Sequence, residues 1–191
     1  MSLFISSGYC IMLAWMILVL PLGWIMPAMA AAFVHELCHY LAIVVCSGKS
    51  TGVRLYSFAA RIELPEMGRG KELVCALAGP IGGLLLWFLS SWYPRLALCA
   101  MIQSLYNLLP VYPLDGGRAL RCLLHLLLPP VSAEFLGAFI QWLTIGALIL
   151  LSVHAFLVLH IGLLPIFAVA VLAFRANDVK IPCKAGHFAL Q

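Results

Sequence analysis

The chain has 191 residues, of which 64% are hydrophobic and only 9% are charged, and its mean hydropathy is +1.09. This composition lies far outside that of soluble domains and indicates a membrane protein. The formal net charge of +4 is too small to indicate nucleic acid as a partner. The seven cysteines include no CxxC pair and lie mostly in apolar runs, so we expect reduced thiols rather than a disulfide framework or a thiolate zinc site.

Apolar stretches of spanning length predict an all-α polytopic membrane protein with about six transmembrane helices in a single domain, 1–191. The expected spans are about 3–20, 24–46, 72–92, 95–128, 131–153 and 155–174, and a polar tail follows at 175–191. No basic region or signal-peptide cleavage site accompanies the first apolar stretch, so we expect it to be retained as a span.

A charged segment at 48–71 separates the second and third spans. Within it, 53–56 and 58–64 alternate in character, and glycine and proline residues surround them, which is typical of short strands. We expect a small β-hairpin or sheet near residues 50–65 at the membrane surface, with an ordered loop as the alternative.

Basic residues predict the orientation in the membrane. With six spans, all of the eleven Lys and Arg residues except Arg95 fall on the side that holds both termini and the charged segment. By the positive-inside rule, both termini are expected to be cytoplasmic.

The second predicted span contains the HExxH motif His35-Glu36-Leu37-Cys38-His39. Histidines four residues apart lie on one face of a helix, so both imidazoles can bind one Zn²⁺, with Glu36 beside them as a general base. The alternatives are a polar contact between helices and a site for a transported metal. An accidental motif is disfavoured because uncompensated Glu and His side chains are costly inside a span.

The fourth predicted span is broken at 107–118 by two prolines and two glycines. Broken backbone at membrane depth is tolerated only where it is buried in protein or lines a cavity, so an aspartate there is predicted to be functional. The candidate third zinc ligands within the spans are Asp115, His125, His154 and His160. Asp115 is favoured because it lies at the break and because an anionic oxygen helps to neutralise Zn²⁺ in a low dielectric.

Three further polar residues accompany this break. Asn107 is predicted either to hold the substrate backbone or developing oxyanion, or to make a hydrogen bond at the helix end, and both interpretations stay open. Arg118 and Arg121 are expected to anchor their helix at the lipid headgroups.

The HExxH motif at 35–39, together with the later segment Asn107-Leu108-Leu109-Pro110-Val111-Tyr112-Pro113-Leu114-Asp115-Gly116-Gly117, resembles the site-2 protease family of intramembrane zinc metalloproteases. The fuller second motif, with its Pro-Leu-Asp-Gly-Gly sequence and basic residue, is similar to the branch that contains the sporulation factor protease, which processes a sigma-factor precursor. The resemblance covers about 24–128.

The resemblance implies a catalytic core at about 24–128, with Zn²⁺ held by His35, His39 and Asp115, Glu36 as the catalytic glutamate and Asn107 assisting. It further implies regulated intramembrane proteolysis of a membrane-tethered protein in a bacterial cell membrane, with regulatory membrane partner proteins. Cys38 departs from the glycine that is common in the family, and we expect no PDZ or CBS module here. The alternative is a non-catalytic family-like protein that binds transmembrane clients.

Overall fold

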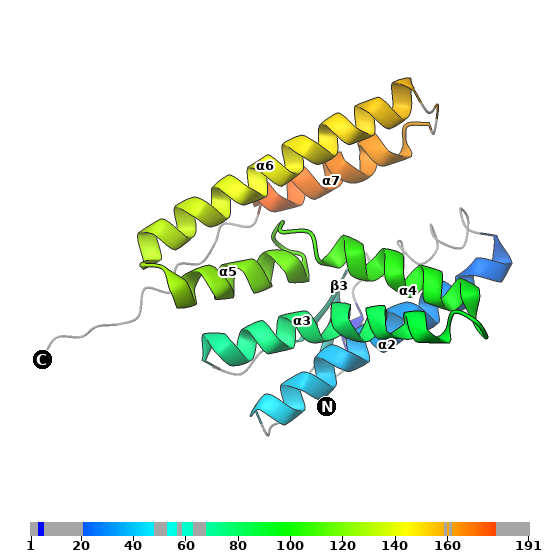
Figure 1. Ribbon diagram of the computed structural model, residues 1–191, viewed down its shortest axis with the longest axis horizontal. Helices are drawn as coiled ribbons and strands as arrows, with labels where there is room; N and C mark the ends of the chain where they lie inside the picture. Colours follow the sequence, from blue (N-terminus) through cyan, green and yellow to red (C-terminus); the bar gives the residue numbers. More distant parts are fainter. Residues whose placement is uncertain are drawn as a thin grey trace, which may run out of the picture. The chain divides into compact units, whose positions relative to one another are not determined.

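A computed structural model describes residues 4–5, 21–47, 53–56, 59–62, 68–158, 160 and 162–178. Helices dominate these residues, with bounds α2 (Leu22–Ser47), α3 (Arg69–Leu85), α4 (Pro94–Asn107), α5 (Asp115–Leu127), α6 (Pro130–Leu157) and α7 (Leu164–Asp178), and a short 3₁₀ helix η1 (Leu86–Leu89) follows α3 (Figure 1). The chain divides within α6 into two compact units, 1–141 and 142–191. The first unit contains the predicted catalytic core.

In the first unit, α3 packs against α2, α4 and α5, and α2 also packs against α4. The buried residues of these helices are mostly small, among them Ala31, Ala76, Ala97, Ala100 and Ala119. Small side chains let helix backbones approach closely, which favours helix association in lipid. The sequence Ala78-Gly79-Pro80 lies in α3, and Gly79 is buried against α2, a close contact that small residues permit.

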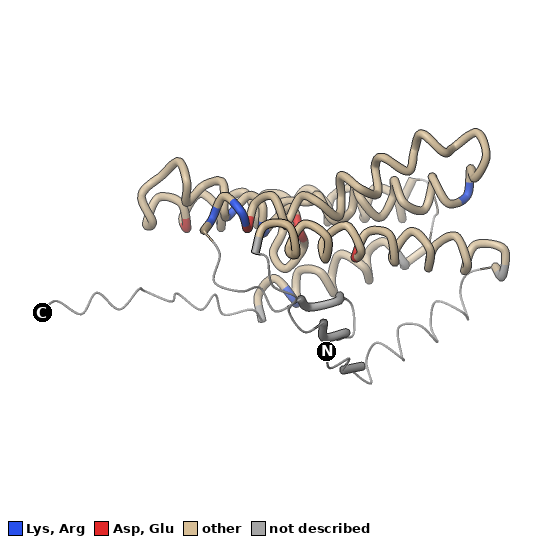
Figure 2. Tube along the Cα trace, turned by 90° about the horizontal axis from the view of Figure 1, so that it is seen from below, with Lys and Arg blue, Asp and Glu red and all other residues tan. Residues whose placement is uncertain are grey.

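Three of the described helical segments are long and apolar enough to cross a membrane: 23–46, 69–89 and 130–157. They match the second, third and fifth predicted spans, while the first predicted span at 3–20 lies almost entirely outside the described residues. Charged residues interrupt the described helices at only a few positions (Figure 2).

The fourth predicted span is two shorter helices, α4 and α5, joined by a break at 108–114. The fifth span is longer than expected, because α6 continues past Val153 to Leu157 and α7 begins only at Leu164. The predicted boundary between the fifth and sixth spans, at His154, was wrong, since His154 lies within the last turn of α6. The α7 helix also extends into the predicted tail, to Asp178.

Short extended segments lie within the predicted strand region. The strands β2 (Val53–Tyr56) and β3 (Ala59–Ile62) pair antiparallel, with Val53 opposite Ile62, and β1 (Phe4–Ile5) pairs parallel with β2. Much of 48–67 lies outside the described residues. A surface hairpin or sheet that serves as a unit at the membrane therefore stays a prediction.

Candidate metal centre

The α2 helix presents His35 and His39 one turn apart on the same face. Both side chains are buried, with relative exposures of 2% and 7%, and their Nε2 atoms are 3.2 Å apart. Their rings meet edge to face, with centroids 4.8 Å apart. The four-residue spacing of the motif therefore brings both imidazoles to one point.

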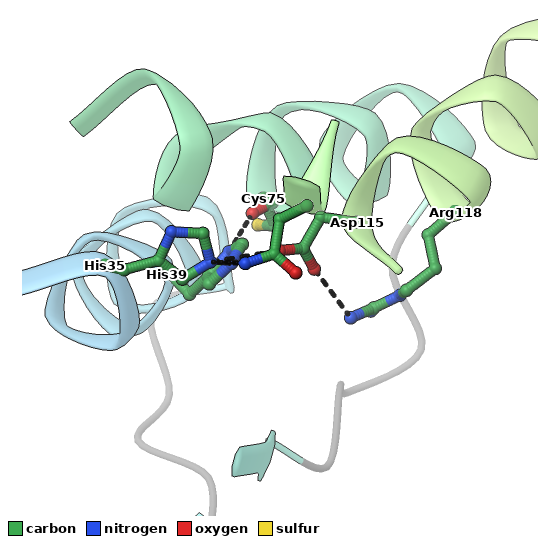
Figure 3. A network of polar contacts seen from close by, with 6 residues as sticks. His35, His39, Cys75, Asp115 and Arg118 are labelled. Carbon is green, nitrogen blue, oxygen red and sulfur yellow. Dashed lines mark hydrogen bonds and ion pairs between the residues drawn. The ribbon is translucent and has the colours of Figure 1, made fainter. Parts of the chain in front are cut away.

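Asp115 reaches the same point from the first residue of α5 (Figure 3). Its Oδ2 atom lies 3.1 Å from His35 Nε2 and 3.0 Å from His39 Nε2. The α5 helix can start there because two prolines, Pro110 and Pro113, lie between α4 and α5 and cannot continue a helix. The structure thus joins the HExxH motif to a residue 80 positions later in the chain.

These three side chains can hold a metal ion, and their separations test whether they fit zinc. Zn–N and Zn–O bonds of about 2.0–2.1 Å in a tetrahedral arrangement place neighbouring ligand atoms about 3.3 Å apart. The three measured separations, 3.0, 3.1 and 3.2 Å, are close to that value. The donor set, two imidazoles and one carboxylate, is also a common catalytic zinc set that leaves a position open.

The backbone carbonyl of Cys75 orients His39. His39 Nδ1–H donates to this oxygen across 2.7 Å, so the proton resides on Nδ1 and the Nε2 lone pair points at the site. Among the described residues, His35 Nδ1 is buried without a hydrogen-bond partner. The two imidazoles therefore differ in how firmly their orientation is fixed.

Gly79 makes room for the His39 ring. A Cβ atom on Gly79 would fall on the ring, 2.6 Å from Cδ2 and 2.7 Å from Cε1. Gly82 makes room for Cys38 in the same way. A Cβ atom placed on Gly82 would lie only 2.9 Å from the Cβ of Cys38. Cys38 is thus accommodated in α2 because α3 has a glycine opposite it.

Glu36 and Asn107 border the three converging side chains. Glu36 is half-buried and follows His35 directly in α2. Asn107 is the last residue of α4, and its Nδ2 atom lies 3.5 Å from His35 Nε2. The centre is therefore assembled from α2, α4 and α5.

The neighbouring charged residues differ from expectation. Arg118 pairs with the other carboxylate oxygen of Asp115, Oδ1, at 3.9 Å (Figure 3), and Arg121 donates to Glu134 across 2.6 Å. Neither arginine is simply a headgroup anchor. His125, a weaker candidate ligand, lies 2.9 Å from Glu134 and away from the centre.

His154 and His160, the remaining candidate ligands, lie in the second unit and are exposed. The described residues therefore bring Asp115, rather than another of the four candidates, to the two HExxH histidines.

The fold is similar to that of a site-2 protease from Methanocaldococcus jannaschii, with a TM-score of 0.61 and 19% sequence identity over 89% of this chain and 84% of that one. At this identity the likeness shows the fold alone. No protein-family model and no curated protein sequence matches the chain. The sequence carries the resemblance through its two motifs, and the structure carries it through a fold similar to that of this site-2 protease.

Two contributors to the site have little or no sequence signal. The Cys75 carbonyl is a backbone group, which any residue type supplies, so no pattern indicates it. Gln141 accepts a hydrogen bond from the Tyr112 amide beside the site. A lone glutamine in the apolar α6 indicates only that a polar partner lies nearby, and the sequence does not say which group that partner is.

Proposed function

We propose that the chain is an intramembrane zinc metalloprotease that hydrolyses a peptide bond in or near the transmembrane segment of a membrane-tethered protein. The observation that carries the proposal is the convergence of His35, His39 and Asp115 within 3.0–3.2 Å of one another. That convergence lies beside a glutamate, and the helix that carries both histidines, α2, is apolar enough to span a bilayer. The fold likeness to a site-2 protease supports the same activity.

His35, His39 and Asp115 would hold the zinc ion. When bound, zinc acts as a Lewis acid that polarises the scissile carbonyl and makes water a stronger acid. A Glu36 carboxylate oxygen accepts a proton from the attacking water and delivers it to the leaving amide nitrogen. The Asn107 amide donates to the carbonyl oxygen as negative charge develops on it.

The substrate is proposed to be a membrane-tethered protein, with a transcription or sigma-factor precursor as the class that the second motif favours. The chain would be a multi-pass protein of the bacterial cell membrane with both termini in the cytoplasm. Regulatory membrane proteins would select substrates or gate their access. In this setting the activity is regulated intramembrane proteolysis.

Cleavage by purified protein in liposomes tests the proposal. The wild-type chain, loaded with one equivalent of zinc, is incubated with co-reconstituted tethered sigma-factor precursors. Glu36→Gln should retain zinc but lose at least about 100-fold in kcat, because general acid–base catalysis typically contributes 10²–10⁴-fold.

Glu72→Gln is the matched control, since Glu72 is a half-buried glutamate of another helix, α3. It should cleave like the wild type. Undiminished cleavage by Glu36→Gln would refute the assigned mechanism. A zinc-loaded wild type that captured the tethered proteins but cut none of them would favour the non-catalytic, client-binding alternative.

A further inference from the structure

Gln141 is a polar side chain within the apolar helix α6, and its contact is with the break that precedes Asp115. The Tyr112 amide donates to Gln141 Oε1 across 3.1 Å. A polar group inside a span is costly unless it is paired. The partner of the Gln141 side chain, the Tyr112 amide, therefore indicates its role. Tyr112 lies only three positions before Asp115.

Backbone hydrogen bonds within the break leave one amide that needs an outside acceptor. The amides that donate to nearby backbone carbonyls are those of Leu108, Leu109, Val111 and Leu114. Pro110 and Pro113 have no amide hydrogen. Tyr112 supplies the remaining amide between α4 and Asp115, and a partly buried amide without an acceptor is costly.

The other side of the break packs directly on the first turn of α5. A Cβ atom on Gly117 would clash with the Tyr112 nitrogen and with the Val111 backbone, and one on Gly116 would clash with the Leu108 carbonyl. The Tyr112 amide thus lies between the turn that starts with Asp115 and the side chain of Gln141. A shift at Tyr112 moves that turn with it.

We infer that Gln141 is a positioning residue that holds the break in place, so that Asp115 Oδ2 faces His35 and His39. It acts through the Tyr112 amide and touches neither metal nor substrate. The inference rests on the proposed function and adds to it a requirement that α6 supply part of the support for the third ligand.

The test uses the full chain in lipid with Gln141→Met, which matches the side chain in length but removes the acceptor, and Gln141→Glu, which keeps an oxygen there. Zinc affinity is measured by competition with a chelator, and amide exchange is followed in the peptide covering 108–117. Outer-sphere partners typically contribute 10- to 100-fold to metal affinity. Gln141→Met should lose about tenfold in zinc affinity, exchange faster at Tyr112, and lower kcat more than it changes KM.

Gln141→Glu should restore zinc affinity to near the wild-type value. Ser152→Ala is the control on the same helix, because the Ser152 hydroxyl donates to Leu148 of α6 itself across 2.7 Å. It should behave as the wild type. If Gln141→Met does not fold, Gln141→Asn withdraws the amide oxygen by one methylene and should show the same loss.

Wild-type zinc affinity and amide exchange in the folded Met or Asn variant would overturn the inference while leaving the proposed function intact. An equal loss in Ser152→Ala would also overturn it, because the effect would then be a general loosening of α6. A wild-type chain that binds no zinc would overturn the proposed function and this inference together.

Discussion

At the scale of single residues, the chemistry depends on side chains that reach one point from distant segments. His35 and His39 come from one turn of α2, and Asp115 comes from the start of α5. The sequence predicted this set because each residue is a strongly polar group in apolar surroundings, where it needs a function or a partner. Their supporting contacts, from the Cys75 carbonyl and Gln141, could not be predicted because they depend on how the helices pack.

Removing the third ligand should release the metal. Asp115→Ala should lower zinc affinity more than about 100-fold, since even loss of an outer-sphere partner costs about 10- to 100-fold. Asp115→Asn, which keeps an oxygen but loses the charge, should lie between Ala and the wild type. Chelator competition measures both, and a full equivalent of tightly bound zinc in Asp115→Ala would show that another group is the third ligand.

Substitution of Asn107 separates its two interpretations. If its amide donates to the developing oxyanion, Asn107→Ala should lower kcat about 100-fold, the typical cost of one such donor. Zinc stoichiometry should stay unchanged, because the amide is not a ligand. Steady-state cleavage in liposomes measures the effect, and an unchanged kcat would assign Asn107 to a structural hydrogen bond at the end of α4.

At the scale of elements, hydropathy predicted where helices lie better than where they end. The α3 helix starts at Arg69 rather than Glu72 because charged residues can continue a helix beyond the membrane. The α6 helix continues past His154 because one polar side chain does not end a helix. The break at 108–114 was predictable, since prolines within it remove backbone donors.

Close packing of α3 on α2 should make Gly79 intolerant of any side chain. The Cβ of Gly79→Ala would press on the His39 ring, so the variant should be less stable by about 1–3 kcal/mol and bind zinc more weakly. Gly146→Ala is the control, because a Cβ there meets nothing within 4 Å. Thermal unfolding and zinc titration compare the two, and a Gly79→Ala protein with unchanged zinc affinity would contradict the observed contact.

At the scale of the whole molecule, the described helices carry many large hydrophobic side chains on their surfaces. The exposed large hydrophobic side chains include Met26, Phe33, Val45, Trp92 and Phe135, as expected for surfaces that face lipid. Sequence composition was sufficient for this conclusion, because water would not solvate such surfaces.

The distribution of basic residues predicts an orientation in the membrane that labelling can test. In a cysteine-free background, a cysteine at Arg69 should react with a membrane-impermeant maleimide only from the cytoplasmic side, and one at Arg95 only from the opposite side. Both positions are exposed; Arg69 begins α3, and Arg95 lies in the first turn of α4, after the α3–η1 segment has ended. Labelling of both from one side would contradict the topology that the positive-inside rule predicts.

Zinc-dependent cleavage tests the central claim most directly. The purified chain in liposomes is stripped with a chelator, reloaded with a graded amount of zinc, and assayed for hydrolysis of a tethered substrate. Cleavage should vanish on stripping and return in proportion to zinc up to one equivalent per chain, while Glu36→Gln binds the same equivalent and stays inactive. Cleavage that persists in the stripped chain, or a reloaded Glu36→Gln as active as the wild type, would contradict an intramembrane metalloprotease built on this centre.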